Sequence, residues 1–229
     1  MDDIVEAIAT NNSGISHLMS KNYGEAMMSF LHSVKKTKDL VSRLRTYEAQ
    51  EGVLHDRVGK SELIMDLVDL GTAEWGAAER FAEEDHISLV CRNAIIIRQS
   101  APQRAIVEDL TAITVSAVYN LAMTYLLLGI DHRCTSHLET ADHYYEFVLS
   151  WQKEDSGPGL VMSALNNMAT IHRILNNENK VTRTLQQLFC TIVTQHHVDP
   201  KDAKRNQRRM MQYLSNLTSL FLNPPVNHR

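Results

Sequence analysis

The chain has 229 residues, a formal net charge of −4 at pH 7, and 44% hydrophobic and 22% charged residues. This length suits one domain or one short repeat array, and the charge argues against extensive nucleic-acid binding. Three scattered cysteines, Cys91, Cys134 and Cys190, predict small buried thiols in a reducing compartment rather than a disulfide framework. The acidic start lacks a secretory signal, and the longest apolar stretch, 120–130, is too short to cross a bilayer. We expect a soluble intracellular protein, cytoplasmic or nuclear, with no membrane partner.

The first 47 residues carry two helical patterns separated by a short turn. Apolar residues recur at helical spacing from Ile4 to Met19. Lys21 and Asn22 form the turn, and a second apolar stripe then begins at Met27 and runs past the usual length of a repeat helix. Together the two segments predict an antiparallel helical hairpin over 1–47.

Residues 48–105 form an insert of different composition. Glycines interrupt the stretch 48–85, which predicts a long, partly ordered loop with one short helix over 63–70. The run from His86 to Arg98 is rich in β-branched residues, which favours an extended conformation. Because an isolated strand leaves its edges unpaired, this run must pack on helices or pair with a partner.

Two further hairpins are predicted over 106–195. The stretch 106–128 contains no glycine or proline and has the composition of a long helix that ends at Gly129. Residues 138–151 carry apolar residues on one face and provide the return helix of this second hairpin.

The third hairpin pairs 161–175 with 180–194 around the asparagine-rich turn 176–179. After it, Asp199 and Pro200 supply an N-cap and a first-turn proline to a last helix over 199–223, which we expect to cap the array.

Small and aromatic residues recur at related positions in these hairpins. The first hairpin has Gly14, Tyr23, Ala26 and Phe30 at these positions. The second hairpin has Leu121, Ala122, Tyr125, Gly129, Ala141 and Tyr145, and the third has Met168, Ala169 and His172. This pattern resembles the tetratricopeptide repeat, a helix-turn-helix of roughly 34 residues, over about half of the chain.

The repeats are not evenly spaced. The corresponding asparagines Asn12, Asn120 and Asn167 lie 108 and 47 residues apart (120 minus 12, 167 minus 120), so an insert interrupts the array. A hairpin, a long insert ending near Arg92 and Asn93, and an Asn-Leu-Ala helix are also similar to a loosely characterised group of tetratricopeptide-like proteins common in diatoms. The resemblance implies a single all-α domain over 1–229, in which interrupted helical hairpins form a short superhelix and the loop insert contains a short β segment.

In tetratricopeptide folds the first helix of each pair lines a concave groove, and the resemblance implies that these asparagines face it. An asparagine side chain offers a donor and an acceptor, so a row of them can hold the backbone of an extended peptide without reading its sequence. Alternatively, the asparagines bond to adjacent helices and stabilise their stacking. The predicted partner-binding residues are Asn11, Asn12, Tyr119, Asn120, Asn166, Asn167, Thr170 and Arg173.

Family members that clamp the carboxylate tail of chaperones use lysine or arginine in this groove. The residues at two of the clamp positions are here Ile8, Ser116 and Ser163, and Met19, Leu127 and Ile174. The resemblance therefore implies no carboxylate-clamp function.

Other motifs are weak. Gly59–Ser61 resembles the end of a phosphate-binding loop, but Leu54 occupies the place of its first glycine. His132, Cys134 and His137 could gather zinc, but their spacing fits none of the usual ligand patterns. Solvated loop histidines and a buried cysteine explain them better.

The start of the last helix carries a basic cluster that we expect to be mostly a solvated face. Its residues are Lys201, Lys204, Arg205, Arg208 and Arg209.

No familiar hydrolase, metalloprotease or dinucleotide-binding motif occurs in the sequence. The sequence therefore predicts a non-catalytic protein–protein interaction scaffold, without cofactor or metal, that binds a peptide or a partner helix in the groove. The alternatives are an enzyme or zinc-binding protein with a site near His132, Cys134 and His137, and a structural protein that self-associates through 90–97.

Overall fold

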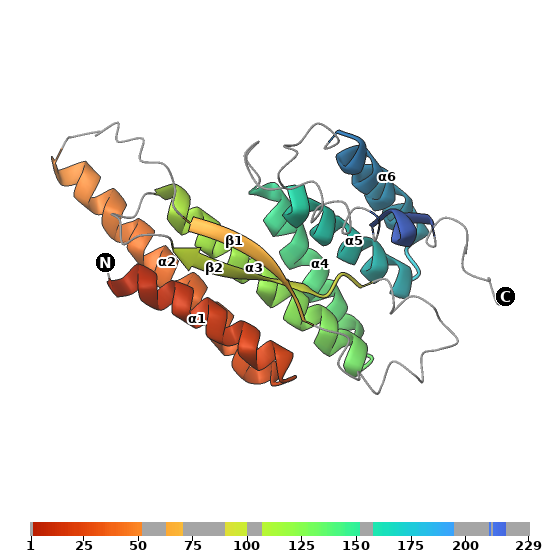
Figure 1. The fold of residues 1–229 in the computed structure, drawn as a ribbon, viewed down its shortest axis with the longest axis horizontal. Coiled ribbons are helices and arrows are strands. Elements are labelled where there is room, and N and C mark those ends of the chain that lie inside the picture. Colours follow the sequence, from red (N-terminus) through yellow and green to blue (C-terminus); the bar gives the residue numbers. More distant parts are fainter. Residues whose placement is uncertain are drawn as a thin grey trace. The chain divides into compact units, whose positions relative to one another are not determined.

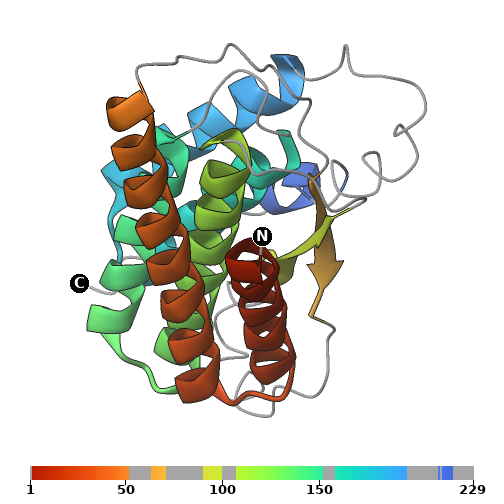
Figure 2. The same ribbon diagram turned by 90° about the vertical axis from the view of Figure 1, so that its left-hand side faces the viewer.

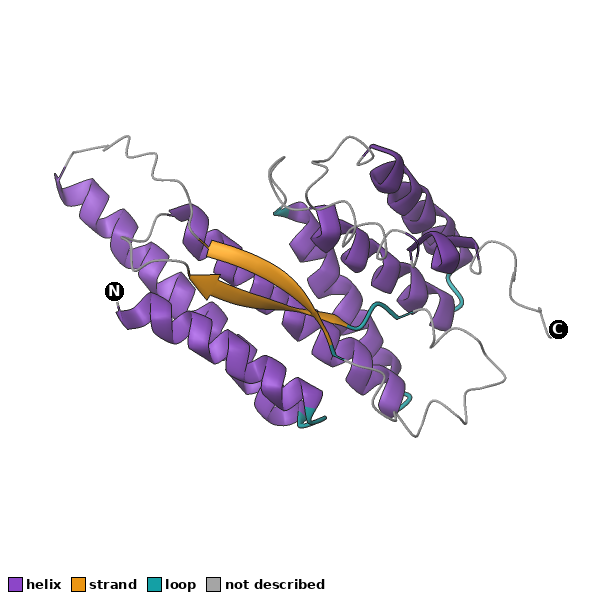
Figure 3. Cartoon of the chain, in the orientation of Figure 1, coloured by secondary structure: helices purple, strands orange, loops and turns teal. Residues whose placement is uncertain are grey.

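The structure, a computed structural model, describes residues 2–51, 63–70, 90–99, 107–151, 158–194, 211 and 213–218. Its elements are α1 (Asp2–Met19), α2 (Tyr23–Glu51), β1 (Leu63–Asp69), β2 (Asn93–Gln99), α3 (Val107–Asp131), α4 (Thr135–Ser150), α5 (Pro158–Ile174) and α6 (Glu178–Thr194). A further short helix covers 213–218. Helices dominate and the strands form one small sheet (Figures 1 and 3), so the predicted mostly helical class is confirmed.

Two compact units make up the chain. The first contains Met1–Gly71 and Asn93–Leu128, and the second contains Thr72–Arg92 and Gly129–Arg229. The extended segment 90–99 therefore contributes residues 90–92 to the second unit and strand β2 to the first.

Helices α1 and α2 pack side by side in the first unit and run antiparallel, which confirms the first predicted hairpin (Figure 2). Their close approach depends on Gly14, because a Cβ atom there would lie 2.6 Å from Cε1 of Phe30. The Phe30 ring is fully buried and cannot easily move away.

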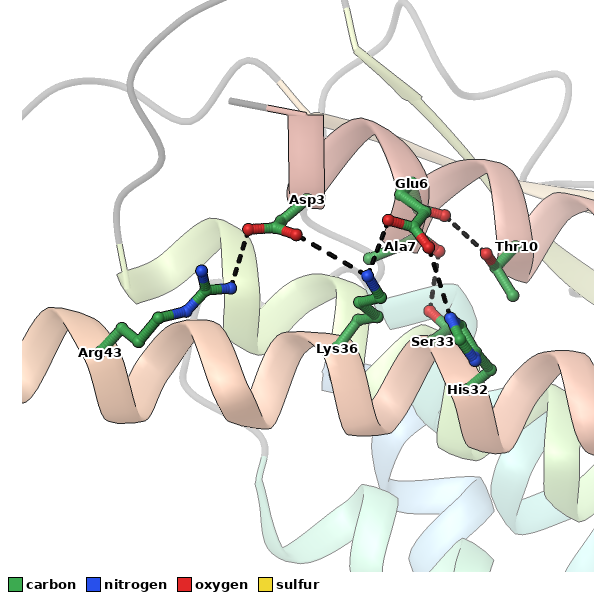
Figure 4. Close-up of polar contacts among 8 residues, drawn as sticks. All are labelled: Asp3, Glu6, Ala7, Thr10, His32, Ser33, Lys36 and Arg43. Carbon is green, nitrogen blue, oxygen red and sulfur yellow. Dashed lines mark hydrogen bonds and ion pairs between the residues drawn. The ribbon is translucent and has the colours of Figure 1, made fainter.

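Charged side chains line the outer side of this helix pair (Figure 4). Lys36 Nζ lies 2.7 Å from a carboxylate oxygen of Glu6 and 3.7 Å from one of Asp3, while Arg43 lies 2.7 Å from Asp3. The hydrogen bond from Lys36 lowers the pKa of Glu6, and the one from Arg43 lowers the pKa of Asp3. These pairs are largely exposed, so each contributes little to stability.

The two strands form an antiparallel sheet in the first unit. Its register places Met65 opposite Ile97 and Leu67 opposite Ile95. The predicted helix over 63–70 is therefore wrong, because pairing with a distant strand overrides the local apolar spacing. The predicted extended run is confirmed over the strand, whereas 86–89 lies outside the described residues.

Helix α3 continues through Gly129 to Asp131, so the predicted end at Gly129 is wrong. A Cβ atom on Gly129 would lie 2.7 Å from Cδ2 of Leu138, so the glycine allows the close approach of the next helix rather than ending α3.

The Asp109–Asp131 part of α3, with a mean hydropathy of 1.6, is long and apolar enough to cross a membrane. However, 78% of its most apolar window is buried inside the protein, and a buried core helix has the same length and composition.

Helices α1, α3 and α5 end in the same kind of turn. Lys21, Arg133 and Asn176 have φ angles of 57°, 52° and 54°, in the left-handed region. In each case the next residue donates its N–H to the carbonyl five residues earlier, as in a Schellman motif. These bonds are Asn22 to His17 at 2.9 Å, Cys134 to Gly129 at 2.9 Å and Asn177 to His172 at 2.8 Å.

In the second unit, α5 packs against both α4 and α6. The helices of the third predicted hairpin are present as α5 and α6, although α5 begins earlier, at Pro158, and α6 begins within the predicted turn, at Glu178. Of the predicted capping helix, the structure describes 211 and 213–218, and the rest lies outside the described residues.

Each unit has an apolar core that includes one residue of the extended segment. In the first unit, the cluster contains Ile4, Ala7 and Ile8 of α1, Ile97 of β2, and Leu110 and Ile113 of α3. In the second unit, it contains Cys91, Met162, Leu165, Leu188, Ile192 and Tyr213.

Cys91 is buried as predicted, but Cys134 is half-buried and Cys190 is exposed. The prediction that all three cysteines are buried is therefore wrong.

Candidate functional site

Asparagine side chains of the first unit hold the backbone of strand β2. Asn12 of α1 accepts a hydrogen bond from the N–H of Ile97 at 3.1 Å and donates one to its carbonyl at 2.8 Å. Asn120 of α3 does the same with Ile95, at 2.7 Å and 2.9 Å. Each amide therefore satisfies both backbone groups of a single residue.

Asn11 joins these two contacts into one network. Its Nδ2 donates to the Ile95 carbonyl at 3.1 Å and to Asn12 Oδ1 at 3.2 Å, and its Oδ1 accepts from Asn120 Nδ2 at 3.0 Å. Asn11 and Asn120 are fully buried, whereas Asn12 is half-buried. A connected buried network of this kind is costly to disrupt, because each lost partner leaves another polar group without a hydrogen bond.

The second unit repeats the contact with another asparagine. Asn167 of α5 accepts from the N–H of Cys91 at 2.8 Å and donates to its carbonyl at 3.1 Å. Asn167 also donates to the hydroxyl of Tyr145 at 3.0 Å. Burial raises the pKa of Tyr145 far above its ordinary value, so this hydroxyl stays protonated.

Strand geometry explains why alternate residues of β2 are held. The N–H and C=O groups of successive residues point to opposite edges of a strand. The backbone N–H and C=O groups of Ile95 and Ile97 point toward the asparagines. Those of Ala94 and Ile96 therefore point toward β1, in agreement with the sheet register. The asparagines thus occupy one edge of β2 in place of a neighbouring strand.

All the other predicted groove residues are buried as well. Tyr119 and Thr170 are fully buried, Thr170 donates to the carbonyl of Asn166 at 3.0 Å, and Arg173 is 6% exposed. Asn166 accepts a hydrogen bond from Asn216 at 2.9 Å. The prediction of a solvent-facing groove that bears Asn12, Asn120 and Asn167 is therefore wrong for Asn120 and Asn167, because the chain's own extended segment covers them, and Asn12 is half-buried.

A separate polar cleft of about 550 Å³ lies among α4, α5 and α6 of the second unit. Its lining residues are Thr135, Glu139, Asp142, His143, Glu146, His172, Leu175, Asn177 and Lys180. At its floor, Asp142 Oδ1 lies 2.8 Å from His172 Nε2, and Asp142 Oδ2 lies 3.1 Å from Lys180 Nζ. The other nitrogen of His172 lies 3.2 Å from the hydroxyl of Thr184.

Burial raises the pKa of Asp142, but His172 and Lys180 outweigh it and hold that pKa below the ordinary value of 3.8. The hydrogen bond to Asp142 in turn raises the pKa of Lys180. The Thr184 hydroxyl belongs to a residue that is only 4% exposed and does not line the cleft. This carboxylate–imidazole–hydroxyl chain therefore does not present a nucleophile to a substrate.

The predicted zinc alternative is not supported by the arrangement of its side chains. Cys134 Sγ lies 3.2 Å from Ser136 Oγ, and this contact lowers the pKa of the Cys134 thiol, assisted by the backbone N–H of His137. In the part of the chain that the structure describes, no three His, Cys, Asp or Glu side chains are arranged to hold a metal ion. Gly59–Ser61 and the basic cluster at 201–209 lie outside the described residues.

No protein-family model, no curated protein and no solved structure matches this chain. Inferences about its function therefore depend on the asparagine contacts and on the residues that resemble a tetratricopeptide repeat.

Proposed function

We propose that the chain is a non-catalytic protein-interaction scaffold, an interrupted tetratricopeptide-like superhelix that holds extended peptide backbone with asparagine amides. The observation that carries this proposal is the paired contact of Asn12 with Ile97 and of Asn120 with Ile95. An amide that bonds both backbone groups of one residue recognises the extended conformation and not the side chain.

The recurring turns support three related hairpins. Asn12 precedes its left-handed turn residue by nine positions (21 minus 12), and Asn167 precedes Asn176 by the same number (176 minus 167). For Asn120 the separation is thirteen (133 minus 120), which adds about one helical turn of roughly 3.6 residues. A spacing that changes by about one turn keeps the asparagine on a similar face of its helix.

The competing structural function treats segment 90–99 as a permanent part of the fold that no partner replaces. The two possibilities differ in whether the asparagines accept a strand that is not covalently attached. A suitable probe is a fluorescein-labelled peptide with the sequence of residues 93–99.

The test measures this peptide's binding by fluorescence anisotropy to the full chain carrying Ile97→Ala. That substitution loosens the chain's own strand but keeps its backbone and every asparagine. We expect saturable binding that Asn120→Asp abolishes, because a carboxylate cannot donate to the peptide carbonyl. Asn179→Asp, at an exposed position of α6, is the matched control and should leave binding unchanged. The proposal fails if folded Ile97→Ala protein binds no peptide, or if Asn120→Asp binds it equally well.

A further inference from the structure

Strand β2 buries the side chains of Ile95 and Ile97 as well as bonding their backbone groups to the asparagines. Ile95 and Ile97 are 2% and 1% exposed. Between and beyond them, Ile96 is half-buried, and Arg98 is exposed and paired with Asp66 of β1. The residues whose backbone is held by asparagine therefore also carry large side chains that are almost completely buried, whereas the small side chain of Ala94 is buried without such a contact.

Ile97 occupies an apolar site whose other buried residues come from α1 and α3, with partly buried residues of α2 packed against it. It packs in the cluster formed by Ile4, Ala7 and Ile8 of α1 and Leu110 and Ile113 of α3. A polar side chain at this position would lose the hydrophobic contribution and bury a hydrogen-bonding group without a partner. We call the surface of α1 and α3 that holds β2 the groove, with Asn12 and Asn120 at its edge. This groove requires an aliphatic side chain at the position of Ile97, whereas its asparagines recognise only the backbone.

Covalent attachment gives β2 an advantage over any free strand. A tethered segment is present at an effective concentration of the order of millimolar, so a free strand must compete with it for the same asparagines. The apparent dissociation constant of the free strand then rises in inverse proportion to the fraction of molecules whose groove is vacant.

We infer that β2 is an internal competitor for the partner of this groove, and that the partner is an extended segment with aliphatic side chains at two alternate positions, replacing Ile95 and Ile97. This inference rests on the proposed function. Binding of the partner releases β2, and with it the pairing between β2 and β1.

The test compares three labelled peptides of residues 93–99 on the full chain carrying Ile97→Ala. These are the natural sequence, the sequence with Ile97→Ser and the sequence with Ile96→Ser as the matched control. We expect the Ile97→Ser peptide to bind about tenfold or more weakly than the natural one, because it loses most of a buried aliphatic side chain. The Ile96→Ser peptide should stay within about threefold of the natural one.

Competition is measured by comparing the natural peptide on the unaltered chain and on Ile97→Ala. We expect the unaltered chain to bind it about tenfold or more weakly, because its own strand is held more firmly. If Ile97→Ala does not fold, Ile97→Val provides a milder loosening of the same strand.

The outcomes separate the two proposals. Equal binding of all three peptides contradicts the side-chain requirement, and equal affinity of the two chains contradicts competition by β2, while backbone recognition survives both results. Absence of binding by every peptide to folded, loosened chain contradicts the proposed function itself.

Discussion

Replacing Asn120 with alanine removes the centre of the network that holds β2 in the first unit. The Ile95 N–H loses its acceptor at 2.7 Å, and Asn11 Oδ1 loses the donor at 3.0 Å. The Ile95 carbonyl keeps one partner, because Asn11 Nδ2 also donates to it at 3.1 Å. Two buried polar groups are therefore left without these hydrogen bonds.

Each buried group without a partner costs about 1–3 kcal/mol, so Asn120→Ala should lower the free energy of unfolding by about 2–6 kcal/mol. The total for a domain is roughly 5–15 kcal/mol, so the loss is a large fraction of the whole. Removing the exposed Asn179 of α6 in the same way should change the free energy by no more than about 0.5 kcal/mol.

Urea unfolding followed by circular dichroism gives both free energies, and native-state hydrogen exchange reports on the Ile95 amide separately. We expect that amide to lose protection in Asn120→Ala and to keep it in Asn179→Ala. A change below about 0.5 kcal/mol for Asn120→Ala, with an equally protected Ile95 amide, would refute the reasoning, since the network would then contribute nothing in solution.

Four further substitutions test other parts of the structure. Gly14→Ala should destabilise the protein by about 1–3 kcal/mol, because its Cβ meets the Phe30 ring. Gly24→Ala is the matched control, since nothing lies within 4 Å of its Cβ, and it should stabilise the protein by about 0.5–1 kcal/mol. Equal urea midpoints for the two variants would contradict this prediction. Arg133→Gly, at a φ of 52°, should stabilise by roughly 0.5–1 kcal/mol in the same assay, and a loss would contradict the left-handed turn. Because the folded pKa of Asp142 lies below its ordinary value of 3.8, the stabilisation by its carboxylate is complete well above pH 3.8 and is lost as the pH falls through the folded pKa. The stability difference between wild type and Asp142→Asn should therefore shrink as the pH falls below about 4, and growth of that difference in this range would contradict the prediction.

The helices could be predicted because their apolar spacing is a local property of the sequence. The stripe from Ile4 to Met19 matches α1, and the predicted long second helix matches α2. The predictions of secondary structure are wrong where contacts with a distant segment determine the local conformation or packing. Residues 63–69 form a strand because β2 pairs with them, and Gly129 lies inside α3, where the absence of a side chain leaves room for Leu138.

The asparagines of the site could be identified, but the segment that they hold could not. Asn12 is 85 positions from Ile97, Asn120 is 25 from Ile95, and Asn167 is 76 from Cys91. Periodicity shows which face of a helix is apolar, but it does not show which distant backbone lies against that face. The need of a β-branched run for edge partners is the signal that the sequence contains, and the asparagines provide those partners.

The polar cleft left no signal in the sequence. Asp142, His172 and Lys180 come from three different helices, and their spacing matches no local motif. Only the packing of α4, α5 and α6 brings the carboxylate, the imidazole and the ammonium group together.

The proposed partner would bind the same asparagines that hold β2, and this affects how binding should be measured. Alanine in place of Asn12 or Asn120 removes contacts that hold the chain's own strand, so a lost partner could reflect a weakened fold as easily as a lost binding surface. Substitutions in the strand separate these effects, because Ile97→Ala leaves the asparagines intact. If a partner strand makes the same backbone hydrogen bonds as β2, these bonds largely cancel in the exchange. The balance is then set by the side chains at the positions of Ile95 and Ile97 and by the advantage of the tether.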